Sequence, residues 1–292
     1  MPLARWRPTK DTLHLYCQII GKIRLALHPR LNHWWHVPLY VTPRGLSTHT
    51  IPYNGGSFEI EFDFSEHRLR MINSMGREED FSLYDGLTVA DFYSSVFANL
   101  AKLGIDAKIR PLPYEAPSTI AFPEDSEHKS YDKEKVEQFH RLLIWADDIL
   151  EEFRGRFIGK STPVHMFWHS FDLALTRFSG RRAPVRAEAN SVEREAYSHE
   201  VISFGFWFGD DNVPSPAFYS YTAPEPEGLA DEPLLPGAAT WVESNGAHLA
   251  VLMYDDVRAD EGRDELVLEF LESAYQAGAR RAGWDIGDLA AR

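Results

Sequence analysis

The sequence of 292 residues contains a single cysteine, Cys17. One cysteine cannot form a disulfide within the chain. No apolar run approaches the roughly 18 residues that a membrane-spanning helix needs. The N-terminal stretch MPLARWRPTKDTLHLY also lacks the continuous apolar segment of a signal peptide. We therefore expect a cytoplasmic protein.

Positive charge is scarce as well. The 30 Lys and Arg residues face 44 Asp and Glu residues, which gives a formal net charge of −14. A chain of this charge is repelled by phosphodiester backbones and by anionic lipid unless a local basic patch compensates. No RNA-binding or zinc-finger motif supplies such a patch. We expect neither nucleic acid nor a membrane as partner.

What the sequence does have is two strong helical patterns on either side of a proline-rich stretch. Residues 111–130 (PLPYEAPSTIAFPEDSEHKS) interrupt the periodic apolar residues and read as a linker between a first half, 1–110, and a second half, 131–292. After the linker, Asp132 is placed to cap a helix with an apolar stripe from Val136 to Phe153. An earlier helix is predicted over residues 12–27.

The two halves repeat an order of motifs. Ile-Gly-Lys (20–22 and 158–160) is followed by paired aromatic and histidine residues, an aliphatic run, then Thr, Arg and Gly. Alternating strands (58–64 and 199–208) and closing amphipathic helices (89–104 and 264–283) come next in both. This order predicts an α+β fold with antiparallel sheets, built from two related halves, each of helix, about four antiparallel strands and helix, packed with pseudo-twofold symmetry.

Two motifs that suggest ligand chemistry fail a check of spacing. GRFIGKS (155–161) has three residues between its glycines, where a phosphate loop needs four, and it follows a helix; Gly159 is expected to end that helix. His165 and His169 lie four apart on a predicted strand, which separates them by about 13 Å. That is too far for one metal ion, so no residue is assigned as a metal ligand.

Glu200 is the most informative carboxylate. Strand alternation puts it on the face of Ile202 and Phe204, and His199 on the opposite face. A carboxylate on an apolar face needs a cationic partner or a raised pKa. Arg44 and Arg177 are the candidate partners. If the site is catalytic instead, Glu200 and His199 are candidates for proton transfer, with His165 and Asp172 as further candidates.

Basic and aromatic residues gather on the repeated segments. Arginine and lysine beside flat rings suit a small anionic ligand. If the halves pack face to face, these side chains converge on a cleft between them. The candidate ligand-binding residues are Lys22, Arg44, Lys160, Arg177, Trp35, Trp168, Tyr197 and Tyr221.

Four long stretches carry a resemblance to a known family. These are NHWWHVPLYVTPRGL, VHMFWHSFDLALTRFSGR, EAYSHEVISFGFW and AFYSYTAPEPEG. Together they resemble an uncharacterised bacterial family known as a domain of unknown function, over nearly the whole chain. The resemblance implies no activity, substrate or cofactor. Candidate residues such as His165, Asp172 and Glu200 fall inside these stretches, and the resemblance gives them no role.

Three functions stay open. The first is binding of a small anionic polar molecule between the halves, with acid/base chemistry of the hydrolase or isomerase type. The second is a non-catalytic module for protein interaction or self-association, with residues 223–238 as a candidate contact. The third is a metal-dependent hydrolase. No dinucleotide fingerprint is present, so redox chemistry fits less well, and no cofactor is identified.

Overall fold

The computed structural model describes residues 2–116, 118–184, 189–244 and 246–291. Within these ranges the chain forms seven α-helices and two antiparallel sheets of six strands each. This confirms the predicted α+β fold class. Each half therefore carries six strands where the sequence predicted about four.

The first sheet contains β1 (Tyr40–Thr42), β2 (Gly45–Ser47), β3 (Ile51–Tyr53), β4 (Gly56–Asp63), β5 (Arg68–Asn73) and β6 (Glu78–Ser82). Its order is β1-β2-β4-β5-β6, with β3 paired to β4. The second sheet contains β7 (His165–Phe167), β8 (Asp172–Arg182), β9 (His199–Trp207), β10 (Ala217–Ala223), β11 (Thr240–Ser244) and β12 (Ala247–Met253). Its order is β11-β12-β10-β9-β8-β7.

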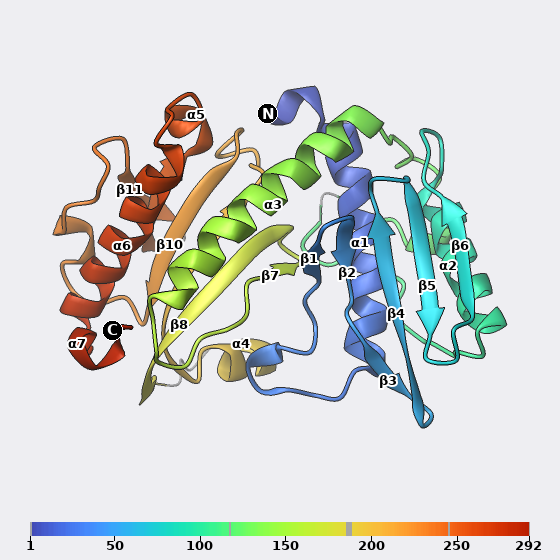
Figure 1. Cartoon of the computed structure of the whole chain (residues 1–292), viewed down its shortest axis with the longest axis horizontal. Helices are drawn as coiled ribbons and strands as arrows, with labels where there is room; N and C mark the ends of the chain where they lie inside the picture. The colour runs from blue at the N-terminus through green and yellow to red at the C-terminus, as the bar shows by residue number, and fades with distance from the viewer. Residues whose placement is uncertain (1, 117, 185–188, 245, 292) are drawn as a thin grey trace.

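The two sheets meet edge to edge. Leu39, just before β1, and Met166 in β7 exchange backbone hydrogen bonds of 2.9 and 2.8 Å. We call this junction the seam; Figure 1 shows β1 beside β7 at the centre of the molecule. In both halves the strand at the seam, β1 or β7, has three residues, and a longer strand lies farther out, β4 with eight residues and β8 with eleven. The predicted two-fold relation between the halves stays a prediction.

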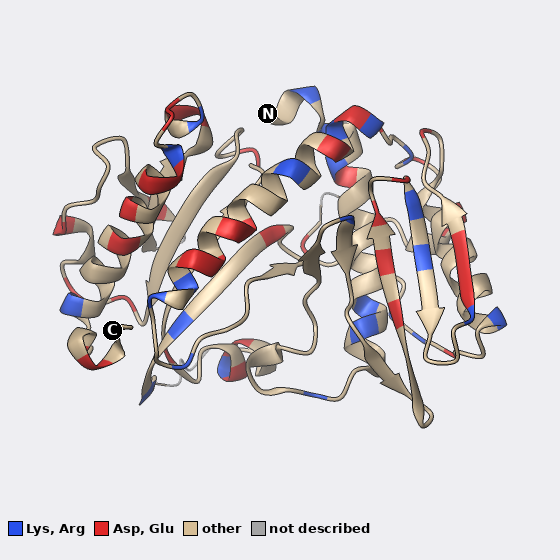
Figure 2. Cartoon of the chain, viewed as in Figure 1, with Lys and Arg blue, Asp and Glu red and all other residues tan. Residues whose placement is uncertain are grey.

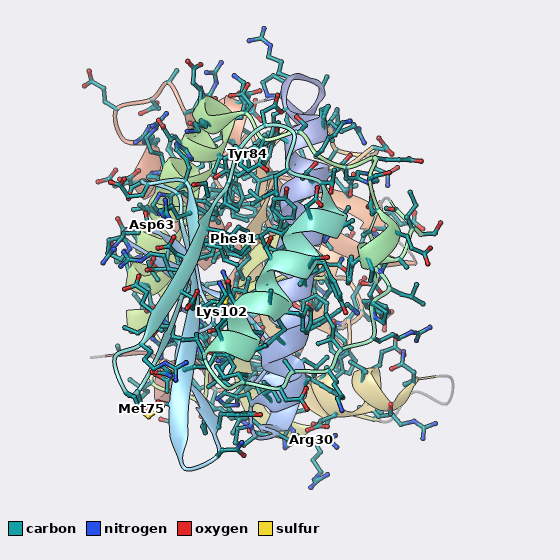
Figure 3. The ribbon with its side chains drawn as sticks, turned by 90° about the vertical axis from the view of Figure 1, so that its right-hand side faces the viewer. Arg30, Asp63, Met75, Phe81, Tyr84 and Lys102 are labelled. Atoms are coloured by element: carbon teal, nitrogen blue, oxygen red, sulfur yellow. The ribbon has the colours of Figure 1, made fainter. Side chains whose placement is uncertain are left out.

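The helices lie on the sheets in two groups. α1 (Arg7–Leu27) and α2 (Val89–Lys102) pack with the first sheet, and α3 (Lys133–Gly155) and α6 (Arg263–Arg281) with the second. Figure 1 shows α3 in front of β8 and α1 behind β4. Figure 3 shows Lys102 at the end of α2. Its ammonium donates to the Glu79 carboxylate of β6 at 3.0 Å. The remaining short helices are α4 (Ser191–Ala196), α5 (Tyr254–Val257), α7 (Ile286–Leu289), η1 (Leu3–Arg5), η2 (Asn32–Trp34), η3 (Phe122–Glu124) and η4 (Leu229–Asp231).

The start of α3 is as predicted, and its end is not. The side chain of Asp132 accepts a hydrogen bond from the N–H of Lys135 at 3.2 Å, which confirms the cap. The helix stops at Gly155, four residues before Gly159. Phe157 then pairs with Ala290, so the chain has already left the helix. Gly159 is required for packing instead, because a Cβ there would lie 2.6 Å from the Phe157 ring.

The proline-rich stretch 111–130 lies against the body of the protein; its residue 117 is outside the described residues. Gln18 of α1 holds its backbone through two hydrogen bonds with Tyr114, donated by the Gln18 amide at 2.7 Å and by the Tyr114 N–H at 2.9 Å. The buried apolar residues of both halves form one cluster. Among the described helices, none combines the length and apolarity needed to cross a membrane.

Candidate functional site

The second sheet has one face covered by α3 and α6. On that face the rings of Phe204 and Phe153 lie 4.9 Å apart, and Gly278 of α6 packs against Ile202. The side chains of the opposite face follow from the register, since directly opposed residues share a face. Thr176 pairs with Ser203, and Ser203 with Tyr221. We call this opposite face, with Asp172, Thr176, Ser203, Tyr219 and Tyr221, the tyrosine face.

Asp172 lies at one end of the tyrosine face, 7% exposed. Its two carboxylate oxygens accept hydrogen bonds from the hydroxyls of Ser170 and Tyr219. In the described part of the chain it has no ion pair. Burial, and the nearby Asp172 carboxylate, raise the pKa of Tyr219 well above its ordinary value. The Tyr219 hydroxyl therefore stays protonated and donates to Asp172.

Gly205 lets Tyr219 reach Asp172. Gly205 lies on β9, the strand between β10 and β8. It is opposed to Tyr219 on one side and to Ala174 on the other. A Cβ at Gly205 would lie 2.5 Å from the Tyr219 ring and 2.2 Å from the carbonyl oxygen of Leu173. The tyrosine ring thus crosses β9 directly over bare backbone.

Hydroxyl groups occupy the middle of the tyrosine face. The hydroxyl oxygens of Thr176 and Ser203 are 2.7 Å apart, and those of Tyr221 and Tyr197 are 3.1 Å apart. Tyr197 directly follows α4, whose start is held by a capping box at Asn190. Burial raises the pKa of Tyr221 well above its ordinary value, yet the residue keeps part of its surface exposed. Tyr221 is therefore largely buried, with part of its surface exposed.

The other end of the tyrosine face is basic. Lys160 lies on a segment that hydrogen-bonds along β8, with its carbonyl accepting from Phe178 at 2.9 Å. The Lys160 ammonium is 3.2 Å from Nε2 of His33 and 5.1 Å from the Trp35 ring. The His199 ring meets the His33 ring edge to face, with the ring centres 5.4 Å apart. Burial, and then the Lys160 charge, lower the pKa of both histidines. Within the described ranges, Lys160 has no carboxylate partner.

Glu200 lies on the opposite side, under α6. Its carboxylate contacts Arg181 at 2.7 Å and accepts hydrogen bonds from Ser179 at 2.9 Å and the Trp284 ring N–H at 3.1 Å. The expectation that Arg44 or Arg177 pairs with Glu200 is wrong. An irregularity in the β8–β9 pairing between Phe178 and Arg182 places Arg181 beside Glu200 instead.

The two arginines proposed as ligand-binding residues lie away from the tyrosine face and from each other. Arg177, 1% exposed, is enclosed by Phe153, Phe157, Phe204 and Tyr275, and its guanidinium carbon is 3.6 Å from the centre of the Phe153 ring. Burial lowers the pKa of Arg177 to about 10. Arg44 lies between β1 and β2 and contacts Asp63 at 3.4 Å.

Three further candidates gather at the seam. The Lys22 ammonium is 5.5 Å from the centre of the Trp168 ring. Trp168 packs beneath Gly21 and donates a hydrogen bond from its ring to the carbonyl of Val37 at 2.9 Å. His165 is 1% exposed and shares its face of β7 with Phe167, which is opposed to Asp172. His165 therefore extends the tyrosine face toward the seam.

The sequence pattern missed Tyr219, Ser203 and His33. A signal for Tyr219 exists in AFYSYT, because residues two apart on a strand share a face. Tyr221 was already a candidate ligand-binding residue, so the same rule could have added Tyr219, two positions earlier on the strand. Its contact with Asp172 could not be foreseen, because it depends on which strands are neighbours.

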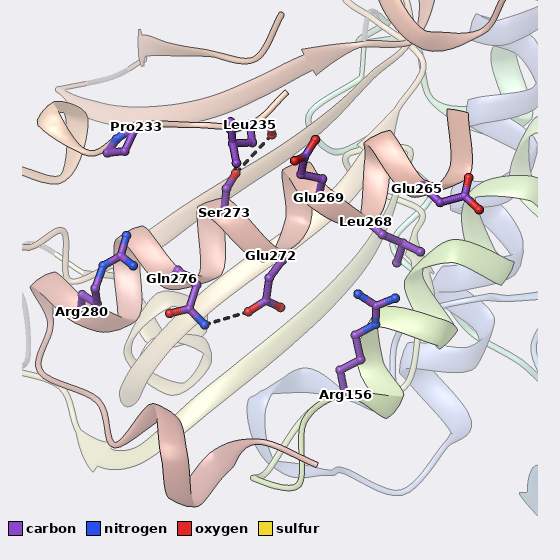
Figure 4. Close-up of a pocket in the computed structure, with 10 residues that line it drawn as sticks. All are labelled: Arg156, Pro233, Leu235, Glu265, Leu268, Glu269, Glu272, Ser273, Gln276 and Arg280. Carbon is purple, nitrogen blue, oxygen red and sulfur yellow. Dashed lines mark hydrogen bonds between the residues drawn. The ribbon is translucent and has the colours of Figure 1, made fainter. Parts of the chain in front are cut away.

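Two open grooves in the described surface lie away from these residues, and neither is a cleft between the halves. One, of about 630 Å³, runs along α6 and is lined by residues that include Arg156, Leu235, Leu268 and Glu272 (Figure 4). The other, of about 560 Å³, lies at the start of α1 beside His128. Figure 2 shows acidic residues along α3 and α6. Among the described residues, no group of three or more His, Cys, Asp or Glu side chains is arranged to hold a metal ion.

Comparison with known proteins gives a family and no activity. No curated protein and no solved structure matches the chain. One family model matches residues 1–291, nearly the whole chain, under the description "Family of unknown function (DUF5996)". The protein therefore belongs to this family of unknown function, DUF5996.

Proposed function

We propose that the tyrosine face binds a small, elongated polar molecule with one anionic group. The observation that carries this proposal is Asp172: a buried carboxylate, held by two hydroxyl donors and without a cationic partner, on the sheet face that α3 and α6 leave free. Buried carboxylates are costly unless their oxygens are well hydrogen-bonded. Each oxygen of Asp172 accepts from one of these hydroxyls and can accept a further hydrogen bond.

The two ends of the tyrosine face suit different parts of a ligand. Asp172 and Phe178 are six residues apart on β8, which corresponds to about 20 Å. A hydroxyl or amino group of the ligand would donate to Asp172, and its anionic group would lie near Lys160. Between them, Tyr221, Thr176 and Ser203 offer hydroxyls, and Trp35 and Trp207 offer flat surfaces.

The arrangement also suits proton transfer. Tyr219 orients Asp172, as a hydrogen-bonded neighbour commonly orients a general base. Asp172 would then accept a proton from the ligand, as in hydrolysis or isomerisation. Glu200 does not share this face, so it is not part of the proposed proton transfer.

A thermal-shift screen with sugar phosphates, nucleotides and organic acids tests the proposal. A ligand present at 100 times its Kd stabilises the folded state by about 2.7 kcal/mol. Tyr221→Phe removes one hydroxyl and keeps the ring, so we expect it to weaken binding about 3- to 10-fold. Asp172→Asn and Lys160→Met should weaken ligand binding more than Tyr221→Phe does.

The matched control is Tyr84→Phe, which removes a hydroxyl from an exposed tyrosine far from the tyrosine face along the chain. It should leave the ligand response unchanged. The proposal fails if no compound stabilises the wild-type protein, or if a stabilising compound acts equally on Tyr221→Phe, Asp172→Asn and Lys160→Met.

A further inference from the structure

Arg24 is a buried cation without a counter-charge. It lies on α1, 3% exposed, and its guanidinium donates a hydrogen bond to the carbonyl of Thr48. The guanidinium carbon is 5.4 Å from the centre of the Tyr40 ring. Its Nε–H has no hydrogen-bond partner. In the described part of the chain no carboxylate lies within ion-pairing distance of Arg24.

His165 presents a second unused nitrogen beside the same ring. It lies on β7, 1% exposed, with its ring 6.3 Å from the Tyr40 ring. Its Nδ1 has no hydrogen-bond partner. Burial lowers the pKa of His165 to about 3, and Arg24 is the nearby charge that contributes most. His165 is therefore neutral at pH 7 and can donate one N–H.

The surroundings of these two residues are more basic than acidic. Lys22, two residues before Arg24 on α1, has its pKa lowered by burial and by Arg110. Glu59 accepts a hydrogen bond from Ser47 at 2.5 Å and raises the pKa of His49 through its charge, and in the part of the chain that the structure describes it forms no ion pair with Arg24. A buried polar group without a hydrogen-bond partner destabilises the folded protein. Both groups lie beside the Tyr40 ring, and one acceptor would satisfy both when His165 carries its proton on Nδ1.

We propose that the seam binds a small oxyanion between Arg24 and His165. Oxygen atoms of a phosphate or carboxylate group would accept from Arg24 Nε and from His165, and the negative charge would neutralise the guanidinium. Tyr40 is partly exposed and stacks on the exposed His49 at 4.0 Å, so it forms the side of the site nearest to solvent. The anion would contact α1 of the first half and β7 of the second, tying the two sheets together. His165 borders the tyrosine face at the seam, and the site shares none of the residues Asp172, Thr176, Ser203, Tyr219 and Tyr221 that define that face.

The test measures thermal unfolding of the full chain with inorganic phosphate or with acetate, against sodium chloride of equal ionic strength. We expect a saturable rise in Tm with at least one of the two anions, and the two arms distinguish a phosphate group from a carboxylate. Arg24→Met should weaken the apparent affinity at least tenfold. Arg30→Met, near the same end of α1 and exposed in its pair with Glu195, should respond as wild type.

A second variant keeps the test informative if Arg24→Met does not fold. His165→Phe preserves an aromatic ring and removes both nitrogens, and we expect it to weaken the same anion at least threefold. Tyr221→Phe should keep the full anion response, which separates this site from the tyrosine face. Equal Tm in phosphate, acetate and chloride would overturn the proposal, and so would an unchanged response of both Arg24→Met and His165→Phe.

Discussion

Asp147 of α3 is a half-buried carboxylate without a hydrogen bond or ion pair in the described part of the chain. Burial, followed by repulsion from Glu151 and Asp148, raises the pKa of Asp147 to about 7 from an ordinary value of 3.8. The unfolded chain therefore loses this proton at lower pH than the folded protein does. The contribution of Asp147 to stability is present below about pH 3.8 and is lost as the pH rises through 7.

Asp147→Asn should consequently stabilise the protein above neutral pH. We expect a gain of about 1 to 3 kcal/mol in the free energy of unfolding at pH 8, and little gain near pH 4. Urea unfolding at the two pH values measures it. Asp148→Asn, at the exposed neighbouring position, is the control and should change stability by less than about 0.5 kcal/mol. A variant no more stable than wild type at pH 8 would contradict the assignment.

Arg177 is held by rings rather than by a carboxylate. Its guanidinium stacks on Phe153 and donates to the Phe153 carbonyl. A planar guanidinium is weakly hydrated and stacks well, whereas an ammonium is strongly hydrated and costly to bury. We expect Arg177→Lys to lose about 2 to 4 kcal/mol of stability, and Arg177→Met, which removes the charge, to lose less. Denaturant unfolding of both variants checks the order; the reverse order would show that the charge itself is needed.

At the scale of elements, the central strands β8, β9 and β10 create the tyrosine face through their register. The pairing Tyr219–Gly205–Ala174 is what lets a ring on β10 reach a carboxylate on β8. Antiparallel strands carry side chains to alternate faces, so the same strands place Arg177 and Glu200 under the helices and Thr176 and Ser203 on the tyrosine face. The two faces therefore have separate chemistry.

Gly205→Ala tests this arrangement. The added Cβ would meet the Leu173 carbonyl at 2.2 Å and the Tyr219 ring at 2.5 Å, so backbone must move. We expect a loss of about 2 to 4 kcal/mol in stability and displacement of Tyr219 from Asp172. Gly155→Ala, at the end of α3, adds a Cβ with no atom within 4 Å and should be neutral or slightly stabilising. Equal stability of both variants would show that the ring does not lie over Gly205.

At the scale of the whole molecule, α1 and the seam hold the halves together. His14 of α1 places Nε2 at 3.0 Å from the carbonyl of His169, in the turn after β7, and Gly21 packs on Trp168 of the same turn. α3 contacts both β1 and β8, and the apolar core is continuous. Buried histidines at such junctions make the joined state sensitive to acid.

Acid should therefore weaken the protein. Burial lowers the pKa of His14 to about 4 and of His165 to about 3, from an ordinary 6.5. Below pH 6.5 the unfolded chain takes up protons that the folded protein does not, so each histidine removes about 1.4 kcal/mol per pH unit. Asp147 acts in the opposite direction, because its raised pKa makes the folded protein hold a proton that the unfolded chain has lost. One such carboxyl against two histidines leaves a net loss of stability as the pH falls from 6.5 to 4.

Urea unfolding at pH 7 and pH 5 measures this loss. His14→Gln should reduce the loss of unfolding free energy between pH 7 and pH 5, because one buried histidine is removed. His248→Gln, which removes a surface histidine whose pKa is raised by Glu225, should leave it in place. Stability that is constant or higher at pH 5 would contradict the buried, neutral state of these histidines.

The sequence alone determined the local features of this protein. Apolar periodicity identified the helices now seen as α1, α2, α3 and α6, Asp132 marked the start of α3, and alternation assigned Glu200 and His199 to opposite faces of their strand. Four long continuous stretches carried the resemblance to the family. Each of these depends on neighbouring residues only, because helix and strand periods are set by the backbone itself.

Only the tertiary structure decided which distant residues meet. It placed Arg181, not Arg44 or Arg177, beside Glu200, through an irregular pairing of β8 and β9. It brought Tyr219 to Asp172 across a glycine, and Arg24 and His165 to one ring at the seam. Strand order and register arise from the fit of the whole core, and a one-residue change in register reverses every face. For that reason no local pattern could supply these contacts.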